Sequence, residues 1–118
     1  MTATAAEPML QTELWVSFVS MLRSYAAAAS LHAGEVKVSM TENSATIAFG
    51  STRLDMQFAP DSSEVKWTMH TASQVPVTGS FTMQPEGTIQ INGATKDLDH
   101  GAIDFIASVT AEGKGSRR

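Results

Sequence analysis

The stretch 45-ATIAFGSTRLDMQF-58 determines how the middle of the chain folds. Apolar side chains alternate with polar or small ones on both sides of Gly50-Ser51, which is typical of strands with one buried face. A two-residue turn there pairs Ile47 with Leu54, and every further apolar pair then falls on the same face. Glycine in the first turn position is what a type II′ hairpin requires. The stretch therefore predicts an antiparallel hairpin.

The same alternation recurs in six segments between residues 36 and 91. Short turns join these segments, which predicts a six-stranded antiparallel meander with one apolar and one polar face. The expected strands are Val36–Met40, Ala45–Phe49, Leu54–Phe58, Val65–Met69, Val77–Met83 and Ile89–Ile91.

Two of the other turns are consistent with this facing of the strands. A three-residue loop 85–87, with Gly87 in the left-handed bulge position, pairs Met83 with Ile89 on the apolar face. A four-residue loop 60–63 joins the third and fourth strands in the same register. A one-residue change in either loop would put apolar side chains into water, so the loop lengths support the predicted facing.

The fourth and fifth strands are expected to place Gly79 opposite Trp67. A three-residue connection, 72–74, produces this pairing and leaves room for the indole over the glycine. We therefore expect Trp67 to occupy a central core position.

A long helix is predicted before the sheet, from Pro8 to Ala33. Proline suits a first helical position, and Gly34 can end the helix in a left-handed conformation. We expect the helix to cross the sheet obliquely or to bend near Ser24. Its apolar face recurs at steps of three and four residues, with Trp15 and Val19 at the margin. That face consists of Leu10, Leu14, Phe18, Met21, Leu22, Tyr25 and Ala29.

A second helix is predicted after the sheet, capped by Asp97 or Asp99 and stopped by Gly113. The sequence thus indicates one α+β domain over residues 8–113, with both helices on one face of the sheet. Residues 1–7 are expected to be loose, and 114–118 to form a disordered basic tail. The apolar face of the second helix consists of Leu98, Ala102, Ile103, Ile106 and Val109.

Composition excludes several classes of protein. The chain has 118 residues, no cysteine and a net charge of −4. The only basic cluster is Lys114, Arg117 and Arg118, so nucleic-acid binding is not expected. Glu7 and Glu13 argue against a signal peptide, and no apolar stretch reaches the length of a membrane span. Because cysteine is absent, we expect a cytoplasmic protein; because no stretch is long enough to span a membrane, we expect no membrane partner.

The polar sheet face carries one group of residues able to perform chemistry. In the predicted register Arg53 lies opposite His70, and Asp55 lies opposite Thr68, with Lys66 beside them. An acid, a base and two cations could bind an anion or move a proton. The alternatives are a solvated face held by cross-strand pairs and, because its side chains are short, the interface of a homodimer.

The apolar interior contains many methionines, which line adaptable pockets but also fill ordinary cores. One hypothesis is a pocket for a small apolar ligand between the N-terminal helix and the sheet. The competing interpretation is a packed core. The candidate pocket residues are Met21, Met40, Met56, Trp67, Met69 and Met83.

An acidic group lies at the start of the second helix: Asp97, Asp99, His100 and Asp104. These residue types ligate metals, but acids at a helix N-terminus also cap free N–H groups. The capping role is favoured, so no metal site is expected. The chain has no GxSxG, GxGxxG, Walker, HExxH or EF-hand motif, so no catalytic residue or cofactor is assigned.

These observations favour a non-enzymatic interaction or ligand-binding domain that dimerises through the polar sheet face or a sheet edge. One alternative is a carrier of a small apolar ligand. The other is an enzyme that uses the polar cluster on the outer face, which would need a second chain or loop to build a cleft.

Overall fold

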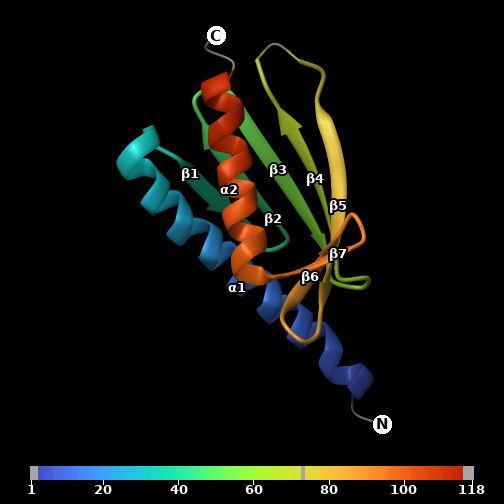
Figure 1. The fold of residues 1–118 in the computed structure, drawn as a ribbon. Coiled ribbons are helices and arrows are strands. Elements are labelled where there is room, and N and C mark those ends of the chain that lie inside the picture. The colour runs from blue at the N-terminus through green and yellow to red at the C-terminus, as the bar shows by residue number, and fades with distance from the viewer. Residues whose placement is uncertain (1–2, 73, 116–118) are drawn as a thin grey trace.

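The computed structural model describes residues 3–72 and 74–115, and for residues 3–11, 33 and 112–115 the backbone alone. It confirms an α+β fold in which two helices contact an antiparallel sheet (Figure 1). The sheet has seven strands in sequence order, one more than predicted. The elements are α1 (Ala3–Ala33), β1 (Lys37–Met40), β2 (Ser44–Phe49), β3 (Thr52–Ala59), β4 (Glu64–His70), β5 (Val77–Gln84), β6 (Thr88–Ile91), β7 (Ala94–Asp97) and α2 (Leu98–Gly115).

The strand pairing confirms the predicted facing of the sheet. Ile47 pairs with Leu54, and Gly50, with a φ of 60°, occupies the first position of the β2–β3 turn. Across the 85–87 loop, Met83 pairs with Ile89. Their apolar side chains therefore lie together on the inner face, which the helices cover.

The connection between β4 and β5 is longer than predicted. Trp67 does pair with Gly79, as expected. However, residues 71–76 join the two strands, where the prediction had a three-residue connection. Proline fixes φ near −65°, far from the roughly −140° of an antiparallel strand, so the chain leaves the ladder at Pro76.

The seventh strand follows a tight Asn92-Gly93 turn. These two residues have φ values of 54° and 80°, as a type I′ turn requires, and Asn-Gly is a strong hairpin signal. The turn pairs Ile91 with Ala94. The prediction missed β7 because its sequence, ATKD, lacks alternating large apolar residues. It is an edge strand with little to bury.

The buried face of α1 contains Phe18 and Leu22, as predicted, together with Trp15 and Val19, which were expected at its margin. Trp15, Phe18, Val19 and Leu22 are all fully buried. The helix contacts both β1 and β5, so it crosses the inner face obliquely, and its N-terminal end extends beyond the sheet (Figure 1).

Both helices extend beyond their predicted ends. α1 begins at Ala3, so Pro8 lies inside the helix, and most of the segment expected to be loose belongs to it. α2 runs to Gly115, past Gly113, and begins directly after Asp97, one of the two predicted caps. Residues 1–2 and 116–118 lie outside the described residues, so the expected tail falls mostly there.

The face that α2 buries differs from the prediction at two positions. Ile103 is 40% exposed, whereas Phe105 is buried. Phe105 packs against Phe18 and Phe81, with ring centroids 6.3 and 5.4 Å apart. The centre of the helix face is therefore rotated toward Phe105, because its ring fills the space between α1 and β5.

The two tryptophans of the apolar interior differ in burial. Trp15 stacks on Phe58, with ring centroids 5.2 Å apart and an interplanar angle of 6°. Trp67 is only partly buried and makes a T-shaped contact with Phe105. The prediction that Trp67 occupies the centre of the core is therefore wrong, and Trp15 is the indole that lies there.

The stretch Thr12–His32 of α1 is long and apolar enough to qualify as a membrane span by length and composition. It includes Trp15, Phe18 and Leu22, whose side chains are buried against the rest of the domain. Core helices and N-terminal signal sequences pass the same test, and 28% of this stretch is buried inside the domain.

Candidate functional site

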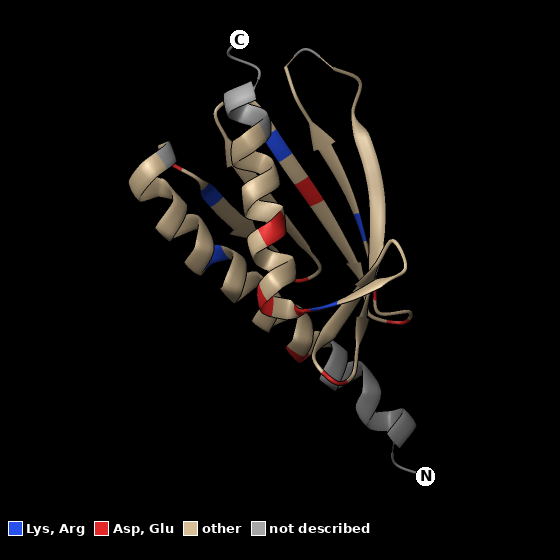
Figure 2. Ribbon diagram, viewed as in Figure 1, with Lys and Arg blue, Asp and Glu red and all other residues tan. Residues whose placement is uncertain are grey.

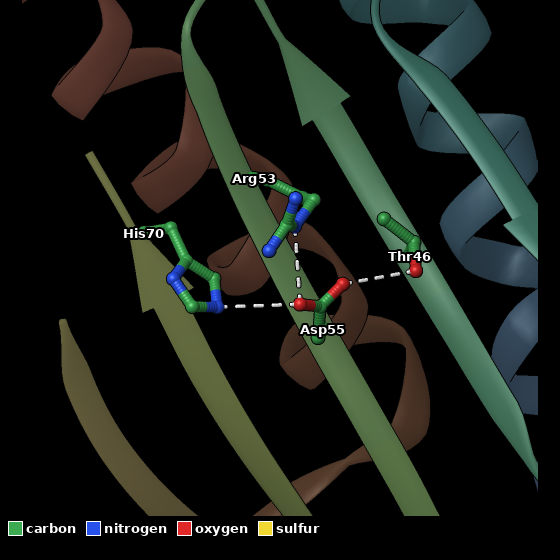
Figure 3. A network of polar contacts seen from close by, with 4 residues as sticks. All are labelled: Thr46, Arg53, Asp55 and His70. Atoms are coloured by element: carbon green, nitrogen blue, oxygen red, sulfur yellow. Dashed lines mark hydrogen bonds and ion pairs between the residues drawn. The ribbon is translucent and has the colours of Figure 1, made fainter. Parts of the chain in front are cut away.

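The outer-face cluster is organised around the carboxylate of Asp55 (Figure 3). Arg53 Nε lies 3.1 Å from Asp55 Oδ2, and His70 Nε2 lies 3.3 Å from the same oxygen. Thr46 donates its hydroxyl hydrogen to Asp55 Oδ1 at 3.0 Å. The three neighbouring residues come from β2, β3 and β4, and together they engage both carboxylate oxygens.

The strand register explains which residues reach this cluster. Asp55 pairs with Thr46 on β2 and with Thr68 on β4, and Arg53 pairs with His70. Lys66 pairs with Gln57 instead and is exposed. The predicted register thus correctly placed Arg53, Asp55 and His70 next to one another. Lys66 lies further along β4.

The chemistry available to this cluster is limited by its own contacts. The guanidinium of Arg53 balances the charge of Asp55, and both carboxylate oxygens already accept hydrogen bonds or ion pairs. The side chains of Arg53 and Asp55 are 54% and 36% exposed. Exposed pairs of this kind contribute at most about 1 kcal/mol to stability. The arrangement is that of a set of cross-strand contacts, which join β2, β3 and β4 on the outer face.

The acidic group at the start of α2 is spread out. His100 Nδ1 lies 3.7 Å from Asp97 Oδ2, and Asp104 pairs with Lys96 of β7. Among the described residues, no group of three His, Cys, Asp or Glu side chains is close enough to hold a metal. Both ion pairs join α2 to the neighbouring edge strand, β7.

The methionines of the predicted pocket occupy different environments. Met56 and Met83 are fully buried core residues, whereas Met21, Met40 and Met69 are partly buried around the core. Trp67 and Met69 border hollows in the surface. The surface hollow that these two residues share lies beside α2.

This hollow is a groove between α2 and the inner face of the sheet. One part, of about 160 Å³, extends toward β6 and β7, and an adjoining part, of about 210 Å³, extends toward the β4–β5 connection. Both parts share Trp67, Met69 and Ser108. The first part is also lined by Ile89, Ile91, Lys96, Gly101, Asp104 and Phe105, and the second by Thr71, Gln74, Val75 and Val77.

Trp67 forms the floor of the groove because Gly79 lies beneath it. A Cβ on Gly79 would be 2.4 Å from Cζ2 of the indole, so only glycine lets the ring lie flat on β5. The indole Nε1 is buried and has no hydrogen-bond partner among the described residues. The groove therefore has an apolar floor, and the paired Lys96 and Asp104 stand on one wall.

Sequence reasoning missed the other half of this groove. Val75 and Val77 are 83% and 55% exposed, although Val77 is at an inward-facing position of β5. The motif Val75-Pro76-Val77 was visible next to the predicted turn. These side chains are exposed because α2 leaves the end of the sheet at the β4–β5 connection uncovered. The sequence does not show this position of α2.

The fold and the groove define an α+β domain in which a seven-stranded meander carries two helices on one face. Comparison of the chain with protein-family models, curated proteins and solved structures found no match.

Proposed function

We propose that this domain is a non-enzymatic binding module, which holds an apolar group of a ligand or partner in the groove beside Trp67. The observation that carries the proposal is the pair of exposed valines, Val75 and Val77, at 83% and 55% exposure. They adjoin Trp67 and Met69 in one hollow. Continuous exposed apolar surface of this kind marks binding sites in soluble domains.

The outer-face cluster supports a weaker second candidate. Its residues are held on neighbouring strands, and the short side chains around it, such as Thr46 and Thr68, would let a second sheet approach closely. A homodimer through this face is compatible with groove binding, since the two surfaces lie on opposite sides of the sheet. Cytoplasmic localisation also remains part of the proposal.

The groove can be tested with the dye 8-anilinonaphthalene-1-sulfonate, whose fluorescence rises in apolar sites. Val77→Thr replaces one methyl in the groove with a hydroxyl and keeps the shape of the side chain. Losing about 1 kcal/mol of apolar contact corresponds to roughly fivefold weaker binding. Val16→Thr is the matched control, because Val16 is 47% exposed on α1, outside the groove.

The expected result is weaker dye binding for Val77→Thr and unchanged binding for Val16→Thr. Equal affinities for all three proteins would place the dye elsewhere and contradict the proposal. A parent protein that does not bind the dye at all would also contradict the proposal.

A further inference from the structure

The first half of β5 has a free edge. β5 is eight residues long, but β6 pairs only with its last three residues, Thr82–Gln84. In the part of the chain that the structure describes, no strand pairs with Val77–Ser80 on that side (Figure 1). The Asn92-Gly93 turn ends β6 before it reaches these residues.

The backbone direction shows which groups this edge presents. The N–H of Met83 donates to the carbonyl of Ser63, on the β4 side, at 2.8 Å. Since successive residues of a strand direct their N–H and C=O groups to opposite edges, those of Thr78 and Ser80 point away from β4. Groups of this kind pair with an added strand.

The chemistry of the edge favours an uncharged partner. The chain has no charged residue between Thr71 and Gln84, and β5 carries no charge along its length (Figure 2). Proteins commonly protect a free edge with lysine or another charge. Here the edge instead borders Val75, Val77 and the apolar groove.

We propose that this edge binds an extended segment of a partner protein, with an apolar side chain at every second position. The segment pairs with the backbone of Thr78 and Ser80, and its apolar side chains enter the groove beside Trp67. This inference rests on the proposed function of the groove and names its occupant. The β6–β7 turn stands at the end of the free edge, so a single short segment fits there better than the whole sheet of a second copy.

The probe is a fluorescein-labelled seven-residue peptide in which valine alternates with threonine. Two versions carry N-methyl groups on alternate amides, one on each edge of the peptide. Strand addition needs the amides of one edge only, so one methylated version should bind at least about tenfold more weakly than the parent, and the other within about threefold. Amide hydrogen exchange should also slow at Thr78 and Ser80 when the parent peptide binds.

Three results would overturn strand addition: no peptide binding at about 1 mM, equal losses for both methylated versions, or unchanged exchange at Thr78 and Ser80. A dimer in which those two amides are already protected would make a second copy the occupant and would also overturn it. If the dye still binds and Val77→Thr still weakens it, only strand addition has failed. If the dye also fails to bind, the proposed function fails with it.

Discussion

Replacing Gly79 with alanine tests the packing that forms the floor of the groove. The new Cβ would be 2.4 Å from Cζ2 and 2.7 Å from Cε2 of Trp67, whereas ordinary contact begins at 3.4 Å. The indole must therefore move by roughly 1 Å, the difference between 3.4 and 2.4 Å. The groove that Trp67 borders gives the indole room to move outward.

The cost follows from two opposing terms. Overpacking of this kind costs about 1–3 kcal/mol, and alanine in a strand recovers about 0.5–1 kcal/mol of conformational entropy relative to glycine. From the middle of each range, Gly79→Ala should therefore destabilise the domain by about 1 kcal/mol. Urea melts measure this loss, and the tryptophan emission should shift to longer wavelength, because Trp67 becomes more exposed while Trp15 stays buried.

The matched control repeats the substitution in a Trp67→Leu background. Without the indole there is no clash, so Gly79→Ala should become neutral or stabilise the domain by about 0.5 kcal/mol. The reasoning is refuted if alanine costs the same in both backgrounds, or if Gly79→Ala leaves the parent protein at full stability.

Four further measurements test the core, the helix contact and the outer face. Trp15→Ala should cost about 3–5 kcal/mol in urea melts, since it empties a fully buried site, whereas Val16→Ala should cost less than about 0.5 kcal/mol; similar losses would contradict the facing of α1. Gly101→Ala should stay within about 1 kcal/mol of the parent, because the gain in helix propensity offsets a clash with one flexible isoleucine methyl; a larger loss would show that α2 cannot shift. Asp55→Asn should cost less than about 1 kcal/mol, as expected for an exposed ion pair, and a larger thermal or urea effect would indicate a stronger network. Thr68→Arg should convert an outer-face dimer to monomer in native mass spectrometry, and a monomeric parent protein would remove that proposal.

The parts of the fold that could be predicted are those where a turn and an alternating pattern agree. Ile47 and Leu54 can share a face only if the turn between them has two residues, so local sequence decides their pairing. The same constraint placed Gly79 opposite Trp67, although the intervening loop proved longer. Helix faces were less certain, because the apolar stripe of α1 is broad and only packing against Phe58 selects Trp15 as its centre.

The outer-face cluster was predictable for the same reason, since cross-strand neighbours follow directly from register. Register alone placed Asp55 between Thr46 and Thr68 and His70 opposite Arg53. The register does not predict which donors contact the Asp55 carboxylate, because those contacts depend on side-chain rotamers. The contacts of Asp55 with His70 and Arg53 therefore became visible only in three dimensions.

The groove was not predictable, because it depends on where β6 stops rather than on any residue that lines it. Asn92-Gly93 reverses the chain after Ile91, and four more residues of β6 would have covered Val77–Ser80. Instead β7 returns along β6, and α2, which starts directly after Asp97, has its sheet contacts mainly with β2, β3 and β7. One turn thus leaves both an unpaired edge and an uncovered part of the inner face. Extending β6 by four residues before the turn should therefore abolish peptide binding and dye binding together, whereas Val77→Thr should weaken each without closing the edge.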